Sequence, residues 1–173
     1  MKRNILIILF LAISTILFPQ EKTDRGYIVK TGDKAPDVKL TLTTGKTIRL
    51  SDLKGKVVVL QFTASWCSVC RKEMPHLEKE VWLPNKDKDF MLIGVDFDEP
   101  LEKVMVFKKQ MKITYPMALD PGAEIFSLFA RKESGVTRNV VIDQNGTIVF
   151  LTRLYDREEF EKMVTKINLL LEE

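Results

Sequence analysis

The stretch VVVLQFTASWCSVCRKEMP, residues 57–75, leads from an apolar run into the only two cysteines of the 173-residue chain, Cys67 and Cys70. Residues 57–62 form a short apolar run that begins with three β-branched residues and is bounded by turn residues, which predicts a buried strand. Four residues separate this run from Cys67, and two residues separate the cysteines. We therefore expect the pair to lie where a buried strand leaves its sheet.

A helix is predicted directly after the cysteines. Apolar residues recur at Met74, Leu77 and Val81, a spacing that places them on one helical face. Pro75 falls inside this pattern and predicts a kink, because proline lacks the N–H that an interior helical turn requires.

Two cysteines at this spacing can form a structural bridge, half of a metal site or a reactive pair. A disulfide across two residues closes a very small loop and constrains the unfolded chain little. A structural zinc site needs four ligands, and His76 is the only histidine. We expect His76 to be a surface residue and no metal to be bound. The reactive pair is therefore the favoured interpretation.

The position of Cys67 suits a nucleophile. Its sulfur should emerge at the carboxyl end of a strand, where open α/β sheets place their sites. The unpaired amides at the helix start favour the thiolate there. Cys70, one turn into the helix, should be more buried and within bonding reach of Cys67. Arg71 and Lys72 add positive charge nearby, or simply form a solvated helix face.

The remaining pattern predicts one α/β domain over residues 27–173. A mixed β-sheet should carry helices on both faces, since strands and helices alternate before a closing hairpin and helix. The predicted strands are 38–43 with 47–50 as a hairpin, 57–62, 90–97, 115–119, and 140–143 with 147–150 around Asn145-Gly146. The predicted helices are the one after Cys70, then 99–112, 122–131 and 157–171.

Residues 1–19 have a different composition. Lys2 and Arg3 precede an apolar run over residues 5–18, the layout of a signal peptide, or of a membrane anchor if it is not cleaved. We therefore expect an exported, periplasmic protein. The two N-terminal basic residues also supply most of the net charge of +3. A nearly neutral body gives no reason to expect nucleic acid binding.

The motif Trp66-Cys67-x-x-Cys70 after a strand resembles the thioredoxin superfamily. The longer string over residues 67–75, with GDKAPD at 32–37 and LSDLKGK at 50–56, resembles its TlpA/ResA-like, redoxin-type branch. The resemblance implies a thioredoxin-like fold with an added N-terminal β-hairpin. It also implies a thiol-disulfide oxidoreductase, more often a reductant, that needs no cofactor.

The same resemblance assigns roles to individual residues. Cys67 would be the nucleophile and Cys70 the resolving cysteine. Glu73 would handle protons beside the pair, the alternative being a solvated acid in the first turns of the helix. Trp66 would be a partly exposed cover over the sulfurs that contacts partners, the alternative being packing at the edge of the core.

Two positions depart from the superfamily pattern. Gln61 stands where thioredoxins have a buried acid, so proton handling would depend on Glu73 or water. Thr137 stands where a cis-proline usually faces the cysteines, which makes it a candidate partner-binding residue. We expect its peptide bond to be trans, because a non-proline cis bond costs about 2.5–4 kcal/mol.

The implied partners are protein disulfides or dithiols and an electron donor in the membrane or periplasm, with the chain acting as a monomer. The alternative function is a peroxiredoxin-like thiol peroxidase. That activity needs a threonine three residues before the reactive cysteine and an arginine facing it. Thr63 lies four residues before Cys67, and Arg138 lies one place past the expected position.

Overall fold

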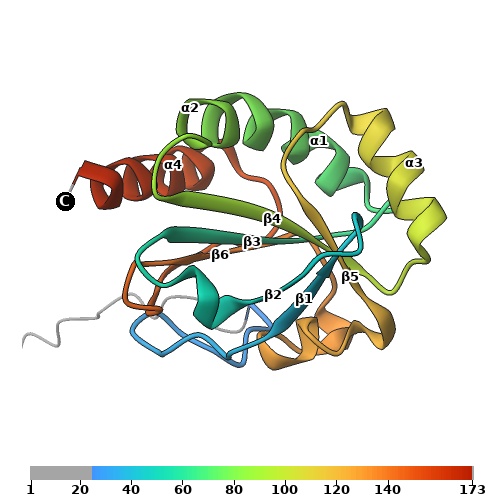
Figure 1. Ribbon diagram of the computed structural model, residues 1–173, viewed down its shortest axis with the longest axis horizontal. Coiled ribbons are helices and arrows are strands. Elements are labelled where there is room, and N and C mark those ends of the chain that lie inside the picture. Colours follow the sequence, from blue (N-terminus) through green and yellow to red (C-terminus); the bar gives the residue numbers. More distant parts are fainter. Residues whose placement is uncertain (1–24, 173) are drawn as a thin grey trace, which may run out of the picture.

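The computed structural model describes residues 25–172, so the predicted signal peptide or anchor at 1–19 lies outside the described residues. A seven-stranded sheet runs through the centre of the molecule (Figure 1). Its strands are β1 (Lys39–Leu42), β2 (Thr47–Arg49), β3 (Val57–Thr63), β4 (Phe90–Phe97), β5 (Met117–Asp120), β6 (Arg138–Ile142) and β7 (Ile148–Leu151). The helices are α1 (Ser68–His76), α2 (Leu83–Asn85), α3 (Leu101–Met111) and α4 (Arg157–Glu172).

The sheet is mixed, as predicted. Its strand order is β2-β1-β5-β4-β3-β6-β7. The neighbours β3, β4 and β5 are parallel, whereas β1 joins β5, and β6 joins β3, in antiparallel pairs. The predicted N-terminal hairpin is present as β1 and β2. Strand β3 therefore lies inside the sheet, hydrogen-bonded on both sides.

Two apolar clusters enclose the sheet. On one face, the apolar sides of α1, α3 and α4 pack on β3 and β4. On the other face, Phe62 packs between Phe126 and Phe129, with ring centroids 5.3 Å apart in each pair. Figure 1 shows all four labelled α-helices on the same side of the sheet, with the 121–134 segment and the N-terminal segment on the other.

The prediction of a continuous helix over 122–131 is wrong. The segment forms short 3₁₀ turns, including Pro121–Ala123 and Phe126–Leu128. Gly122 adopts a positive φ of 67°, and the Asp120 carboxylate accepts the N–H groups of Ile125 and Phe126, which replaces continuous helical pairing. Phe126 and Phe129 of this segment are buried, whereas Leu128 is exposed.

The helix after the cysteines is irregular where Pro75 predicts a break. The α-helical pattern of α1 ends at His76 and gives way to π-helical turns over Leu77–Trp82, before α2. Within residues 25–172, no helix combines the length and the apolar character needed to span a membrane.

The N-terminal segment before β1 runs along the outer side of β7. The N–H of Gly32 donates to the carbonyl of Ile148, and the N–H of Ile148 donates to the carbonyl of Asp33. Ala35 donates to the carbonyl of Gly146 in the hairpin turn. These contacts fix the segment against the β6–β7 hairpin.

Because Leu60 is fully buried in the central strand, Leu60→Ala should lower the free energy of unfolding by about 2–5 kcal/mol. The matched control is Leu169→Ala on the exposed side of α4, which should change it by less than about 0.5 kcal/mol. Urea unfolding followed by circular dichroism measures both. Equal losses in the two variants would contradict this placement of the core.

Candidate active site

Cys67 and Cys70 lie at the junction of β3 and α1, as the sequence predicts. Cys67 is the N-cap of α1, and its Sγ accepts the backbone N–H of Cys70 at 3.1 Å. The two residues form a disulfide, with their Cα atoms 5.3 Å apart. Cys67 retains 7% of its surface, whereas Cys70 is fully buried. Only the first cysteine therefore has any surface toward solvent.

Thr137 faces both sulfurs. Its Oγ1 lies 3.2 Å from the Sγ of Cys67 and 2.9 Å from the Sγ of Cys70. The peptide bond between Val136 and Thr137 is cis, so the expectation of a trans bond is wrong. That expectation rested on the local preference of one peptide bond. It omitted the buried contacts that fix this loop, which include the Leu154 N–H bonded to the Thr137 carbonyl at 2.9 Å.

Glu73 is buried, which rules out the alternative of a solvated acid. Its Oε1 accepts the Nδ2 hydrogen of Asn139 at 2.7 Å, and its Oε2 accepts the Nε2 hydrogen of Gln61 at 3.3 Å. Burial raises the pKa of Glu73 to about 8, since the two amide donors offset the loss of water only in part. A carboxyl one helical turn after Cys70 thus titrates near neutral pH.

Gln61 is a hydrogen-bond partner of this carboxyl. The Tyr115 hydroxyl donates to Gln61 Oε1 at 2.8 Å, which leaves the Nε2 end of the amide toward Glu73. Tyr115 and Asn139 were not identified from the sequence. The signal for Asn139 was present, as a polar amide at the start of an apolar strand.

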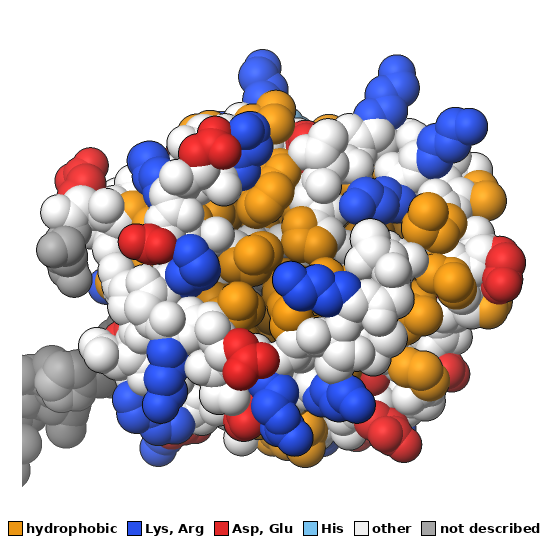
Figure 2. All heavy atoms as spheres, in the orientation of Figure 1, with side chains coloured by type: hydrophobic (Ala, Val, Ile, Leu, Met, Phe, Trp, Pro, Cys, Tyr) orange, Lys and Arg blue, Asp and Glu red, His pale blue; other side chains and the backbone are white. Residues whose placement is uncertain are grey.

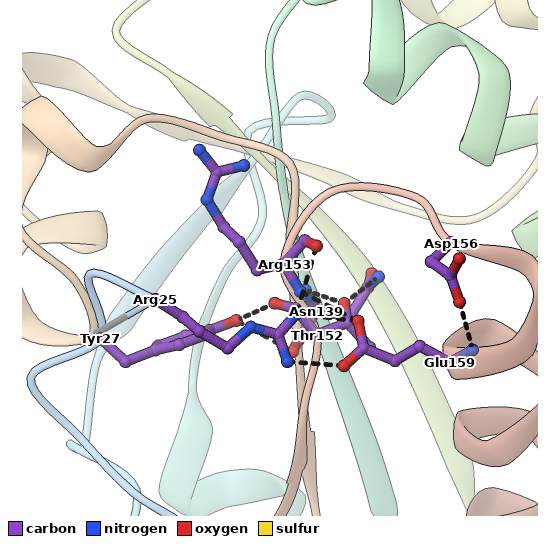
Figure 3. Close-up of polar contacts among 7 residues, drawn as sticks. All are labelled: Arg25, Tyr27, Asn139, Thr152, Arg153, Asp156 and Glu159. Atoms are coloured by element: carbon purple, nitrogen blue, oxygen red, sulfur yellow. Dashed lines mark hydrogen bonds and ion pairs between the residues drawn. The ribbon is translucent and has the colours of Figure 1, made fainter. Parts of the chain in front are cut away.

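A second layer of contacts joins Asn139 to the N-terminal segment and α4 (Figure 3). The Tyr27 hydroxyl donates to the carbonyls of Thr152 at 2.6 Å and Asn139 at 3.3 Å. Arg25 reaches past them to an ion pair with Glu159 of α4. Residues from four separate segments therefore meet around Asn139.

Trp66 stands beside the cysteines with 59% of its surface exposed. Its ring contacts the Phe97 ring edge-on, with the centroids 6.4 Å apart. The side chain is thus anchored along one edge and open to solvent over the rest. The ring is therefore exposed and also makes a packing contact, and its role as a cover over the sulfurs stays a prediction.

The loop before Trp66 is held by an acid from another strand end. Glu99 accepts the backbone N–H of Ser65 at 2.6 Å and its hydroxyl at 2.7 Å, and pairs with Lys103. The neighbouring Asp96 is buried at the end of β4, and burial together with the Glu99 charge raises its pKa to about 8. This acid pair was not predicted from the sequence.

Three other candidates are bonded to groups other than the sulfurs. His76 is bonded to Glu80 at 2.8 Å. The Thr63 hydroxyl contacts the Met74 sulfur at 3.6 Å. The Arg138 guanidinium donates to atoms of the 134–135 turn and lies over a tyrosine ring. In the part of the chain that the structure describes, no three His, Cys, Asp or Glu side chains are grouped as metal ligands.

These positions bear on the peroxidase alternative. A peroxidatic cysteine needs a threonine and an arginine beside it, and the hydroxyl of Thr63 and the guanidinium of Arg138 are bonded elsewhere. No observation favours that alternative over disulfide exchange.

Comparison with known proteins agrees with this geometry. The Redoxin family model matches residues 30–167. The thiol-disulfide oxidoreductase ResA of Bacillus thuringiensis subsp. konkukian is 33% identical over 150 residues, which cover 83% of this chain and 85% of that protein.

Solved structures give the same result. The solution structure of a candidate protein disulfide isomerase from Bacteroides thetaiotaomicron is 60% identical, with a TM-score of 0.83 over 86% of this chain and 94% of the other. A candidate thiol:disulfide interchange protein DsbE from Chlorobium tepidum is 31% identical, with a TM-score of 0.73 over 83% and 99%. The chain belongs to the Redoxin family and is a TlpA/ResA-like thiol-disulfide oxidoreductase of thioredoxin-like fold.

Proposed function

We propose that the protein is an exported reductase of protein disulfides, in which Cys67 is the nucleophile and Cys70 the resolving cysteine. As a thiol-disulfide oxidoreductase it acts on protein thiols and disulfides. The observation that carries the assignment of roles is the unequal burial of the pair: Cys67 reaches the surface and Cys70 does not. The catalytic unit would be the thioredoxin-like domain of residues 27–173.

The reaction begins from the dithiol form. The Cys67 thiolate attacks one sulfur of a partner disulfide, forms a mixed disulfide and releases the first partner thiolate. Cys70 then attacks the Cys67 sulfur, re-forms the Cys67–Cys70 bond and releases the second partner thiolate. Two electrons pass to the partner, and the two protons of the dithiol end on its two thiols. The Cys70 N–H that faces Cys67 Sγ supports negative charge on the attacking sulfur.

Glu73 would take the proton from Cys70. The Cys70 thiol is buried and must lose a proton before it can attack. The Glu73 carboxyl lies one turn further along α1, also buried, and its pKa of about 8 suits proton transfer near neutral pH. Asn139 and Gln61 would hold it in place during the transfer.

Trp66 and Thr137 would contact the partner. The exposed Trp66 ring offers apolar surface beside Cys67, as aromatic side chains do at many interfaces. The Thr137 hydroxyl lies against both sulfurs. A partner sulfur that reaches Cys67 would come close to this hydroxyl.

The reducing direction is supported by the carboxyl near the pair. A disulfide is strongly oxidising when its thiolate form is stabilised. A carboxylate nearby disfavours thiolate charge and so destabilises the reduced form. The ionised fraction of Glu73, which grows as the pH approaches its pKa of about 8, therefore favours a low reduction potential. This agrees with the direction that the family resemblance suggests.

Export is supported by the composition of residues 1–19. The oxidised protein, with its Cys67–Cys70 disulfide, would then be reduced again by a dithiol donor in the membrane or periplasm. This chain would act as a monomer, either free or attached to the membrane by its N-terminus. On the face shown in Figure 2, Lys and Arg side chains are scattered among Asp and Glu. This surface gives no support for nucleic acid binding.

Cys70→Ser should trap a stable mixed disulfide between Cys67 and a model protein disulfide, because the resolving attack is lost. Non-reducing electrophoresis and mass spectrometry of the adduct measure this. Cys67→Ser is the matched control and should trap almost none, since the remaining thiol is buried. Stronger trapping by Cys67→Ser would reverse the assigned roles.

Equilibration of the Cys67/Cys70 couple with glutathione buffers at pH 7 should give a reduction potential of about −270 mV or below, the range of thioredoxin. The ratio of dithiol to disulfide is read by alkylation and mass spectrometry. A value of about −180 mV or above would place the protein among oxidants and isomerases and would overturn the proposed direction.

Glu73→Gln should slow reduction of a model protein disulfide about 100-fold at pH 7, the lower end of what general acid–base groups contribute. Glu78→Gln is the matched control, because Glu78 is a buried glutamate of the following turns that bonds Thr114 instead. Its rate should stay within about twofold of wild type. Equal slowing in both variants would remove Glu73 from the mechanism.

Glu73→Gln should also change how the free energy of unfolding depends on pH. Because the folded state raises the pKa of Glu73 from 4.5 to about 8, the folded chain keeps a proton there that the unfolded chain releases. The free energy of unfolding of the oxidised protein should therefore fall as pH rises through this window, by up to about 1.4 kcal/mol per pH unit. Glu73→Gln should remove this part of the slope, whereas Glu78→Gln should keep it.

A further inference from the structure

Tyr115 touches neither sulfur, yet it bonds to the group that holds Glu73. Its hydroxyl is fully buried and donates to Gln61 Oε1 at 2.8 Å. The Nε2 end of the same amide lies 3.3 Å from Glu73 Oε2. These three side chains come from the segment before β5, from β3 and from α1. They form a single line of hydrogen bonds that ends at the carboxyl.

We propose that Tyr115 is a positioning residue for disulfide exchange, holding the Gln61 amide with its NH₂ group toward Glu73. The inference rests on the proposed role of Glu73. It concerns which end of the Gln61 amide faces the carboxyl. Contacts between Gln61 and Glu73 alone do not fix this orientation.

The orientation matters because a primary amide has a donor end and an acceptor end. With its NH₂ toward Glu73, Gln61 stabilises the carboxylate. Turned by half a rotation, it would offer its oxygen and stabilise the protonated acid instead. The two orientations therefore shift the carboxyl equilibrium in opposite directions.

Tyr115 selects between them. In the observed orientation, its hydroxyl hydrogen has an acceptor in Gln61 Oε1. After a half rotation, it would face the NH₂ group, and its own hydrogen would need another acceptor in a fully buried site. Leaving a buried donor unpaired is costly, so the hydroxyl favours the orientation that supports the carboxylate.

The second amide is fixed differently. Asn139 Nδ2 donates both to Glu73 Oε1 at 2.7 Å and to Thr152 Oγ1 at 3.0 Å, so a hydroxyl beside it already holds its donor end. The other titratable groups that act on Glu73 are Tyr27, Glu159 with its partner Arg25, and the two thiols when reduced. None of them is hydrogen-bonded to Gln61 in the described residues.

Tyr115→Phe should therefore raise the pKa of Glu73 by about half a unit to one unit, the size of one buried hydrogen bond. The ¹³C shift of the Glu73 side-chain carboxyl, followed by NMR over pH in the oxidised protein, measures this. The signal is assigned by its loss in Glu73→Gln. The pH–rate profile of disulfide reduction should move upward with it.

The matched control is Tyr27→Phe. It removes a tyrosine hydroxyl from the same polar cluster, but one that donates to the backbone carbonyls of Thr152 and Asn139. It should shift the pKa of Glu73 by less than half as much as Tyr115→Phe. Equal shifts in the two variants would show a general loss of packing and would overturn the proposal.

Gln61→Met gives a second test, because it removes both ends of the amide. This variant alone should raise the pKa of Glu73, and adding Tyr115→Phe to it should change nothing further. Additive shifts in the double variant would show that Tyr115 acts on Glu73 by another route and would contradict the proposal.

If Tyr115→Phe does not fold, the wild-type protein still provides the test. The Gln61 NH₂ protons should keep their nuclear Overhauser contacts to the Glu73 side throughout the titration. Transfer of these contacts to the Tyr115 ring would overturn the proposal. Because each of these titrations is read without turnover, a failed Cys70→Ser trap would count against the proposed function and leave this result intact.

Discussion

Strand β3 is buried at every residue and hydrogen-bonded on both sides, to β4 and to β6. Because β3 ends at Thr63 and α1 follows directly, Cys67 lies at the carboxyl edge of the sheet, at the start of α1. The same pairing brings Asn139 of β6 directly opposite Gln61 of β3. The two amides that bracket Glu73 are thus a consequence of strand register.

Within residues 25–172, the hydrogen-bond donors to the carboxyl between those amides are the amides themselves, and no cation pairs with it. A buried acid with an arginine or lysine partner stays charged, with a depressed pKa. The two amides that donate to Glu73 are neutral, so they offset its loss of hydration only in part. Its pKa therefore rises to about 8. The partly buried Glu80, which is bonded to Arg157, shows the opposite behaviour, with its pKa lowered to about 2. The same fold therefore shifts the pKa values of two glutamates in opposite directions, because one is bonded to amides and the other to an arginine.

Local pattern was enough to predict the parts of the fold that depend on local signals. The buried β3 run, the hairpin at Asn145-Gly146 and the helix after Cys70 each follow from spacing and turn chemistry. The segment 122–131 was different, because its apolar spacing looks helical while the Asp120 carboxylate and the positive φ of Gly122 redirect its backbone.

The site divides in the same way. The cysteines were recognisable from their own neighbours in the sequence. The cis bond before Thr137 and the contacts of Tyr115, Gln61 and Asn139 arise from elements far apart in the chain. A pattern of residue types contains no information on which of two amide ends will face a carboxyl, since that depends on partners from other strands.

The contacts of the N-terminal segment with the start of β7 have a consequence for the edges of the sheet. An open sheet edge presents unpaired N–H and C=O groups, to which a strand of another chain can add. Here Gly32 and Asp33 occupy backbone groups of Ile148 on one edge of the sheet, and β2, the other edge, is only three residues long. One edge of the sheet is therefore covered where β7 begins and the other edge is short, two features that limit strand addition by another protein chain.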